Sequence, residues 1–334
     1  MKTYSLVFFA FFLLVLNQAS DLMSSDSVIR VKPRSTGIKP VTTKIVFKSV
    51  DGGRTWQDIT EGLPNYSGEK GFVIGGGFAT NNGFYLRTGD GLFFDKQNST
   101  VPDWTKKILS GNHVGIFPGK TGLLAFNYDD GQILQATNEK KDWLPVYRNF
   151  QPKDVLTFFE ADKGTVFIGT NTGLFKLVDA GKAWKQVFSA SKGVRKLAES
   201  GGVLMGLTQK GIIRSTDNGD HWNLVTTEGD HGIDIQRING GFAAITESTE
   251  RRFRVRTSHD DGITWQTIDA GLPIHVFNIV EVGGNLFCSH SKGISGSSDN
   301  GKTWKLLLPL IDRSIFTLSV SGNVIYATRN LGGC

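Results

Sequence analysis

The sequence predicts an all-β fold made of seven repeated units, each of which supplies four short strands. Its seven tryptophans recur every 38 to 48 residues, close to the roughly 40 to 45 residues of a four-stranded sheet unit. The residues that precede several of these tryptophans repeat as well, and no stretch shows the periodicity of an amphipathic helix. Together these observations favour a seven-bladed β-propeller, in which each sheet is one blade around a central axis.

One unit can be followed strand by strand between residues 155 and 188. Short apolar or β-branched runs alternate there with turns that contain Gly, which is the pattern of consecutive antiparallel strands. The expected strands are residues 155–160, 166–170, 174–177 and 184–188, with a hairpin turn at 171–173 and a second turn at 179–181. The same order of runs fits residues 194–225 and 276–308.

The two ends of the sequence complete the last unit. Residues 315–320 and 324–328 match a first and a second strand, and the sequence then stops at Cys334. The missing third and fourth strands are found at the front of the domain, in residues 44–47 and 56–59. We therefore expect a last blade closed by both termini, which leaves the ring without a gap.

Four of the seven tryptophans end the same eight-residue pattern, S-x-D-x-G-x-T-W, with His221 as the one departure. This pattern resembles the Asp-box, or BNR repeat, of sialidases, sortilin-type receptors, xyloglucanases and a photosystem II assembly factor. The resemblance implies a sialidase-like or sortilin-like β-propeller whose Asp-boxes lie away from the functional face. The positions that match the motif are Asp51, Gly53, Trp56, Asp217, Gly219, Trp222, Asp260, Gly262, Trp265, Asp299, Gly301 and Trp304.

The motif also has a local physical reason. A tight turn between antiparallel strands needs a residue that tolerates positive φ, and Gly supplies it. The Asp carboxylate can accept hydrogen bonds from turn amides, and the Trp can wedge between neighbouring blades. We therefore expect a structural role for the boxes. Decayed copies precede Trp143 and Trp184, and a longer turn, 95–103, replaces the box before Trp104.

The N-terminus has the features of a secretory signal. Lys2 precedes an unbroken apolar run of 11 residues, 6–16, which is too short to span a bilayer. We expect a signal peptide at residues 1–20, a Ser-rich linker at 21–43 and the propeller at 44–334; a retained signal anchor is the alternative. No Cys follows the run and no other segment is long and apolar enough to span, so the expectation is a secreted or periplasmic protein that is not a lipoprotein.

The net charge indicates the class of ligand, and the cysteine content limits the possible disulfides. The formal net charge is +6 and the basic residues are dispersed, which favours an anionic glycan or an acidic protein face as partner over nucleic acid. The only cysteines are Cys288 and Cys334, so a disulfide framework is excluded. A single Cys288–Cys334 bridge and two free thiols both remain open.

Several chemistries are disfavoured by the motifs. Residues 296–303 satisfy the phosphate-loop pattern, but they form the fourth Asp-box and a strand follows them where a phosphate loop needs a helix. No zinc-protease or serine-elbow motif occurs, and no metal or cofactor site is expected. Sialidases carry an Arg-Ile-Pro segment and six blades. Neither is predicted here, so the resemblance covers the boxes and the architecture but not an active site.

Strand direction places the expected ligand face. Because strands alternate in direction within a blade, starts of first strands and ends of second strands share the face opposite the Asp-boxes. The candidate ligand-binding residues are Arg87, His113, Asp154, Arg195, Glu247, His275, His290, Arg313 and Arg329. Four of them are Arg, which suits carboxylate or phosphate groups.

The function expected from the sequence is that of an exported binding or scaffold module for an anionic glycan or protein ligand. The alternative is a sialidase-like glycoside hydrolase, and whether the chain is an enzyme is left undecided. A hydrolase needs two carboxylates, or a Tyr with a carboxylate, that face each other across the site. Asp154 and Glu247 are the candidates for such a pair.

Overall fold

The computed structural model describes residues 43–63, 73–88, 91–97, 99, 101–107, 114–120, 122–137, 143–147, 150–151, 154–225 and 231–330. Residues 1–42, with the expected signal peptide and nearly all of the expected linker, lie outside this set. The chain from Thr42 onward forms one compact unit.

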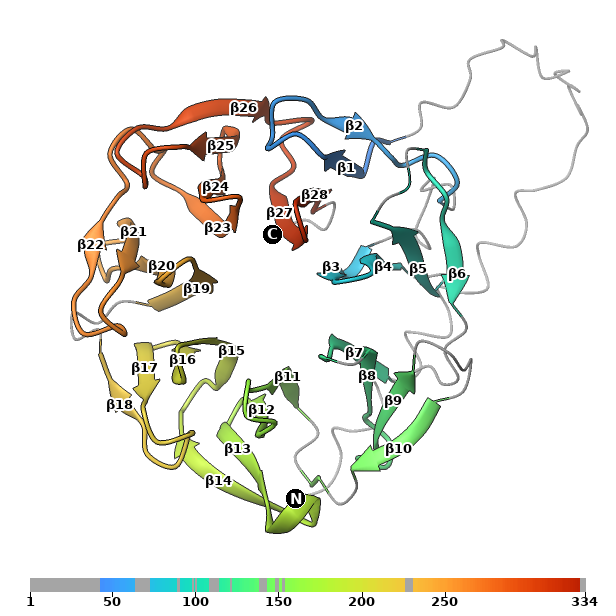
Figure 1. Ribbon diagram of the computed structural model, residues 1–334, viewed down its shortest axis with the longest axis vertical. Coiled ribbons are helices and arrows are strands. Elements are labelled where there is room, and N and C mark those ends of the chain that lie inside the picture. The colour runs from blue at the N-terminus through green and yellow to red at the C-terminus, as the bar shows by residue number, and fades with distance from the viewer. Residues whose placement is uncertain are drawn as a thin grey trace, which may run out of the picture. The chain divides into compact units, whose positions relative to one another are not determined.

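This unit contains seven antiparallel sheets of four strands each, arranged around a centre (Figure 1). The first strands of the blades lie innermost, and each contacts the first strand of the next blade around a complete ring. Among the described residues, the one helical segment is a single 3₁₀ turn, η1 (Asp179–Gly181). The predicted all-β, seven-bladed propeller is therefore confirmed.

We number the blades by their first strands in chain order. Blades 1 and 2 consist of β3 (Val73–Thr80), β4 (Gly83–Thr88), β5 (Gly91–Lys96) and β6 (Thr105–Lys107), then β7 (Val114–Pro118), β8 (Gly122–Asn127), β9 (Ile133–Thr137) and β10 (Trp143–Tyr147). Blades 3 and 4 consist of β11 (Val155–Glu160), β12 (Val166–Thr170), β13 (Gly173–Val178) and β14 (Ala183–Ser189), then β15 (Val194–Ser200), β16 (Val203–Thr208), β17 (Gly211–Ser215) and β18 (Asn223–Leu224).

The remaining blades follow the same plan. Blades 5 and 6 consist of β19 (His231–Ile238), β20 (Gly241–Glu247), β21 (Phe253–Ser258) and β22 (Gln266–Thr267), then β23 (Val276–Val282), β24 (Asn285–His290), β25 (Gly293–Ser297) and β26 (Lys305–Pro309). Blade 7 consists of β27 (Phe316–Ser321) and β28 (Val324–Arg329), joined by β1 (Val46–Ser49) and β2 (Gln57–Asp58).

Blade 7 is closed by both ends of the domain. Its strand order is β2-β1-β28-β27, so strands from the start and the end of the domain share one sheet. β1 pairs antiparallel with β28, with Phe47 opposite Ala327. The sequence prediction of a two-plus-two closure is confirmed.

The hydrophobic core is divided among the contacts between blades. Seven clusters of buried side chains are found among the described residues, each built from two neighbouring blades. Each cluster is covered by one tryptophan from the later of its two blades, as expected for a side chain that wedges between sheets. These are Trp56, Trp104, Trp143, Trp184, Trp222, Trp265 and Trp304.

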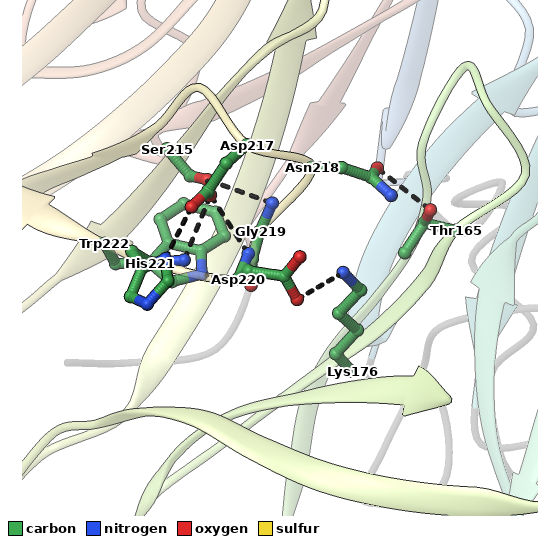
Figure 2. Close-up of polar contacts among 9 residues, drawn as sticks. All are labelled: Thr165, Lys176, Ser215, Asp217, Asn218, Gly219, Asp220, His221 and Trp222. Atoms are coloured by element: carbon green, nitrogen blue, oxygen red, sulfur yellow. Dashed lines mark hydrogen bonds and ion pairs between the residues drawn. The ribbon is translucent and has the colours of Figure 1, made fainter. Parts of the chain in front are cut away.

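The intact Asp-boxes fold as compact hydrogen-bonded turns, shown for blade 4 in Figure 2. The Ser215 hydroxyl donates to Asp217 and accepts the amide of Gly219, with both bonds within 2.9 Å. Asp217 also accepts the backbone amide of His221 at 3.0 Å and lies 2.6 Å from its ring Nδ1. In the other three boxes a Thr hydroxyl makes this last contact at 2.6 Å. His221 thus replaces Thr without loss of the turn.

The box turn needs two left-handed residues, whereas the sequence predicted one. Gly219 has φ of 82°, and Asn218 before it has φ of 59°. The equivalent residues before the box Gly are Gly52, Asp261 and Asn300, all with positive φ. Gly, Asn and Asp are the residue types that tolerate this conformation, so the sequence carried the signal at this position too.

The box Gly is also required by packing. A Cβ added at Gly262 would lie 1.8 Å from Cε of Met205, and one at Gly219 would lie 2.4 Å from Cζ of Phe167. Each of these partners belongs to the preceding blade. The box Gly therefore lies in close contact with the preceding blade, which leaves no room for a side chain at this position.

Basic side chains on third strands tie three blades to the next one. Each occupies the residue before the box serine, or its equivalent, and each reaches the following blade's box turn. The contacts are Lys48 Nζ to Asp95 Oδ2 at 3.2 Å, Lys176 Nζ to Asp220 Oδ1 at 2.7 Å (Figure 2) and Arg214 Nε to the Asp261 carbonyl at 2.6 Å. In blade 1, Phe94 pairs with Thr105 as Arg214 pairs with Asn223. Asp95 therefore stands at the serine position of the replaced box.

Candidate ligand-binding channel

The two ends of the central channel differ in the loops that surround them. Strand direction places the turns between first and second strands on the same end as the Asp-boxes, which we call the Asp-box end. The hairpins between second and third strands and the connections between blades surround the opposite end. The sequence predicted the ligand site at the opposite end.

The described candidate residues do share the opposite end by their strand positions. Arg87, Glu247, His290 and Arg329 lie at the ends of second strands, while Asp154, Arg195, His275 and Arg313 lie at or just before the starts of first strands. His113 lies outside the described residues. Within the described part of the chain, no hydrogen bond or ion pair joins any two of these eight side chains.

Two of these candidates are buried in the protein. Arg329 is 2% exposed and donates to the Lys44 carbonyl at 2.6 Å and to Asp312 at 3.1 Å. His290 is 1% exposed, and its Nε2 lies 2.8 Å from the Ser295 hydroxyl. Burial lowers the pKa of His290 to about 4. Both side chains are buried and already have partners within the protein, so the proposed ligand contacts do not include them.

The other candidates are more accessible. Arg195 is exposed and donates to the Gly232 carbonyl of the next blade at 2.9 Å. Asp154 accepts the Asn171 amide of its own hairpin at 2.9 Å. His275 and Arg313 are exposed, and the His275 ring packs edge-on against Phe253. Arg87 and Glu247 are half-buried. Their role in binding remains a prediction.

A cavity of about 520 Å³ lies toward the Asp-box end of the channel. It is bordered by the innermost strands of blades 1 to 4 and by the first turns of blades 1 and 2, and we call it the channel cavity. Its volume falls in the range of roughly 300 to 1,000 Å³ that small-ligand sites occupy. Its lining includes Asn81, Asn82, Tyr85, Phe117, Lys120, Thr157, Phe159, Glu160 and Lys196.

A repeated β-bulge places one group of polar side chains along the channel. The register shifts once near the start of β11, β15, β19 and β23, in four consecutive blades. Such a bulge re-aims the side chain that follows it. The residues directly after the shift are Thr157, Lys196, Asp234 and Asn278.

Three of these side chains form a chain of contacts across blades 4 to 6. Lys196 Nζ donates to Asp234 at 2.7 Å, and the Asp234 side chain is 5% exposed while that of Lys196 is 34% exposed. Asp234 also accepts Asn278 Nδ2 at 2.6 Å and the Ile279 amide at 3.0 Å. A buried carboxylate needs such partners, so Lys196 is held between Asp234 and the channel cavity.

A second group of charged side chains lies beside the cavity, where the first turn of blade 2 meets blade 3. Glu160 accepts the backbone amide of Lys120, from the preceding blade, at 2.6 Å. The Lys120 ammonium donates to the Ala161 carbonyl at 2.6 Å and to Asp162 at 3.0 Å. Burial, with the charge of Glu160 adding to it, raises the pKa of Tyr147.

The sequence prediction did not include the cavity residues. It considered strand-one starts, whereas Glu160 lies at a strand-one end and Lys120 lies in the turn that follows β7. A signal existed in the charged residues Lys196 and Glu199, which stand in one first strand with the apolar residues Val194, Leu197 and Ala198. The direction in which these side chains point depends on the bulge, and the sequence has no distinctive pattern that would predict this shift of register.

Neither a metal site nor a membrane-spanning helix is found among the described residues. In that part of the chain, no three or more His, Cys, Asp or Glu side chains gather as a metal site. Nor does any helix there have the length and apolarity to cross a membrane. Cys288 is a buried free thiol whose pKa is raised by burial, and Cys334 lies outside the described residues.

Comparison with known proteins gives matches at the level of fold. No protein-family model and no curated protein matches the sequence. A solved structure of YCF48 bound to D1 peptide is 12% identical, with a TM-score of 0.54, and the match covers 78% of this chain and 93% of that one. Such an identity shows a shared propeller fold and nothing finer.

Two further matches come from longer proteins. The extracellular domain of a hybrid two-component system from B. thetaiotaomicron is 15% identical with a TM-score of 0.57, over 76% of this chain and 35% of that one. An ancestral GH74 enzyme is 14% identical with a TM-score of 0.51, over 80% of this chain and 49% of that one. This chain spans half or less of these two proteins, and membership of an Asp-box family remains a prediction.

Proposed function

We propose that this chain is an exported binding module whose ligand is a peptide segment of another protein, held in the channel cavity. The observation that carries the proposal is the cavity itself, because it combines aromatic rings, two Asn side chains and charged groups from four blades. Peptide ligands need apolar contacts together with a few placed polar groups. A propeller of similar fold, matched over 93% of its length, is bound to a peptide.

Two observations favour binding over glycoside hydrolysis. Hydrolysis of the canonical kind uses two carboxyl groups on either side of the scissile bond. Among the described residues that line the channel cavity, Glu160 is the one carboxylate. Tyr85, which could complete a Tyr–carboxylate pair, is buried and packs against Phe78 and Phe94. Asp154 and Glu247, the pair considered from the sequence, lie at the opposite end by strand direction, and Asp154 is bonded to its own hairpin.

Export is supported by the signal-like N-terminus and by the fold match to an extracellular domain. The anionic glycan considered from the sequence was assigned to the opposite end, and it is an outcome of the tests rather than part of this proposal.

A peptide-display selection tests the proposal. Random peptides would be selected on the protein from residue 44 onward, and the dissociation constants of enriched peptides measured by fluorescence polarisation. Thr157→Trp should fill the cavity and weaken binding by about tenfold or more, because the ligand loses its space. Thr267→Trp, on the exposed outermost strand β22, is the matched control and should bind as the native protein does.

Melting temperatures of both variants would show whether they are folded. Peptides that bind folded Thr157→Trp as tightly as the native protein would place the site elsewhere. A failure to enrich any peptide, together with turnover of chromogenic glycosides, would favour the hydrolase function instead.

A further inference from the structure

The two lysines that line the channel cavity are already paired with carboxylates. Lys196 lies 2.7 Å from Asp234, and Lys120 lies 3.0 Å from Asp162. Asp162 also has Arg237 at 3.6 Å, and its amide donates to the buried Glu199. Glu160 is the third charged residue of the lining.

Glu160 is the charged group of the cavity without an ionic partner. Its Oε2 accepts the Lys120 backbone amide, which carries no charge. Among the described residues, no ion pair engages Glu160, and no hydrogen bond engages its second oxygen. A half-buried carboxylate in this position can accept further hydrogen bonds, and a cationic donor would offset its charge.

Aromatic rings also line this cavity. Phe117 lies on β7 of blade 2, the blade whose Lys120 amide Glu160 accepts, and its half-buried ring lines the cavity. Phe159 precedes Glu160 on β11, so its side chain leaves the opposite face of the sheet and packs toward blade 4. Tyr85 is buried and packs against Phe78 and Phe94. A carboxylate and an aromatic ring that line one cavity favour ammonium and guanidinium groups, because the ring faces attract cations.

We propose that the channel cavity takes a cationic side chain of the ligand, a lysine or arginine, which pairs with Glu160 in the part of the cavity that Phe117 also lines. This inference rests on the proposed peptide-binding function and adds the charge of the group that enters. It opposes the anion preference that the net charge of the sequence suggested, because the cavity lysines are already paired.

Three capped hexapeptides of one sequence would test it, with lysine, norleucine or glutamate at one central position. The dissociation constant of each would be measured for the native protein by fluorescence polarisation. The expected order of affinity is lysine, then norleucine, then glutamate, with about fivefold to tenfold between the first two. Glu160→Gln should reduce the ratio between lysine and norleucine to about one, since the amide oxygen still accepts the Lys120 amide but carries no charge.

Glu281→Gln is the matched control. Glu281 accepts the Asn239 amide of the preceding blade at 2.5 Å, as Glu160 accepts that of Lys120, but it does not line the cavity. This variant should keep the native preference for lysine. Equal binding of all three peptides, or a lysine preference that survives Glu160→Gln, would overturn the inference while leaving peptide binding intact. If none of the three peptides binds and display also enriches none, the proposed function itself fails.

Discussion

The hydrogen bonds of the box turns lower the pKa values of the Asp residues in the boxes. Hydrogen bonds from the Thr side chain and amide lower the pKa of Asp51, Asp260 and Asp299 to about 2. The pKa of Asp217 is lowered by the backbone amide and then the ring of His221. These bonds favour the charged form, because only the carboxylate accepts them all. The boxes therefore stabilise the fold through ionised Asp.

Acid should remove this contribution in a defined window. The pKa of Asp260 is about 2 in the folded state and 3.8 as the reference value, so its stabilisation is present above pH 3.8 and is lost as pH falls toward 2. Asp260→Ala should lower the melting temperature at neutral pH, and the difference from the native protein should shrink across this window. Calorimetry at a series of pH values would measure it. Asp261→Asn, at the neighbouring left-handed position, is the control and should show no such trend; a difference constant down to pH 2 would contradict the assignment.

At the scale of elements, basic side chains on three of the third strands join one blade to the next. The most buried of these is Lys48–Asp95, whose side chains are 2% and 1% exposed. Lys48 also donates to the Ser99 carbonyl at 2.9 Å. This pair links β1, from the start of the domain, to β5 of blade 1. It therefore fixes the closing strand at the junction of blades 7 and 1.

Breaking this pair should be costly, but replacing both partners should not. Lys48→Met leaves Asp95 buried without its cation and should lower the free energy of unfolding by about 3 to 5 kcal/mol. Lys48→Met with Asp95→Leu should recover most of that loss, because an apolar pair needs no desolvated charge. Urea unfolding monitored by tryptophan fluorescence would measure both.

Lys44→Met is the matched control for the substitutions at the Lys48–Asp95 pair. Lys44 belongs to the same segment and lies 3.8 Å from Asp58, but its side chain is 61% exposed. Exposed pairs contribute about 0 to 1 kcal/mol, so this variant should unfold nearly as the native protein does. A similar small loss for Lys48→Met would show that the buried pair does not secure the ring.

At the scale of the whole molecule, stability depends on a closed circle of blade contacts. Each blade contacts its two neighbours, and each of the seven core clusters needs two blades. β1 contributes Phe47 to the cluster of blades 6 and 7 and Val46 to that of blades 7 and 1. The closing segment therefore serves two clusters at once.

Deleting residues 44–59 should abolish cooperative folding. The deletion removes β1, β2 and Trp56, so blade 7 loses its two outer strands and two core clusters open to water. Circular dichroism during heating would follow the transition. A deleted protein that melts with the midpoint and cooperativity of the full domain would refute the closure as a stabilising device.

The opposite end of the channel carries a separate prediction from the sequence. If Arg195 and Arg313 bind an anion there, Arg195→Glu with Arg313→Glu should abolish binding of sulfated or sialylated glycans on an array. Binding to the native protein should weaken as salt rises, because exposed charges are screened. Both side chains are exposed, so the melting temperature should change little; an unaltered glycan signal in the double variant would exclude these two residues.

The sequence by itself determined the number of blades, the closure of the last one and the place of each tryptophan. These three features depend on the residues of each turn and on the length of the repeat, and both have the same effect in every blade. Tertiary structure alone decided which polar residues meet. Lys48 and Asp95 form a hydrogen bond between two blades. His290 and Arg329 are buried, although residues at the ends of strands are often exposed to solvent. Bulges place Lys196 beside Asp234. Such contacts arise between segments far apart in the chain, and the period of the repeat carries no information about them.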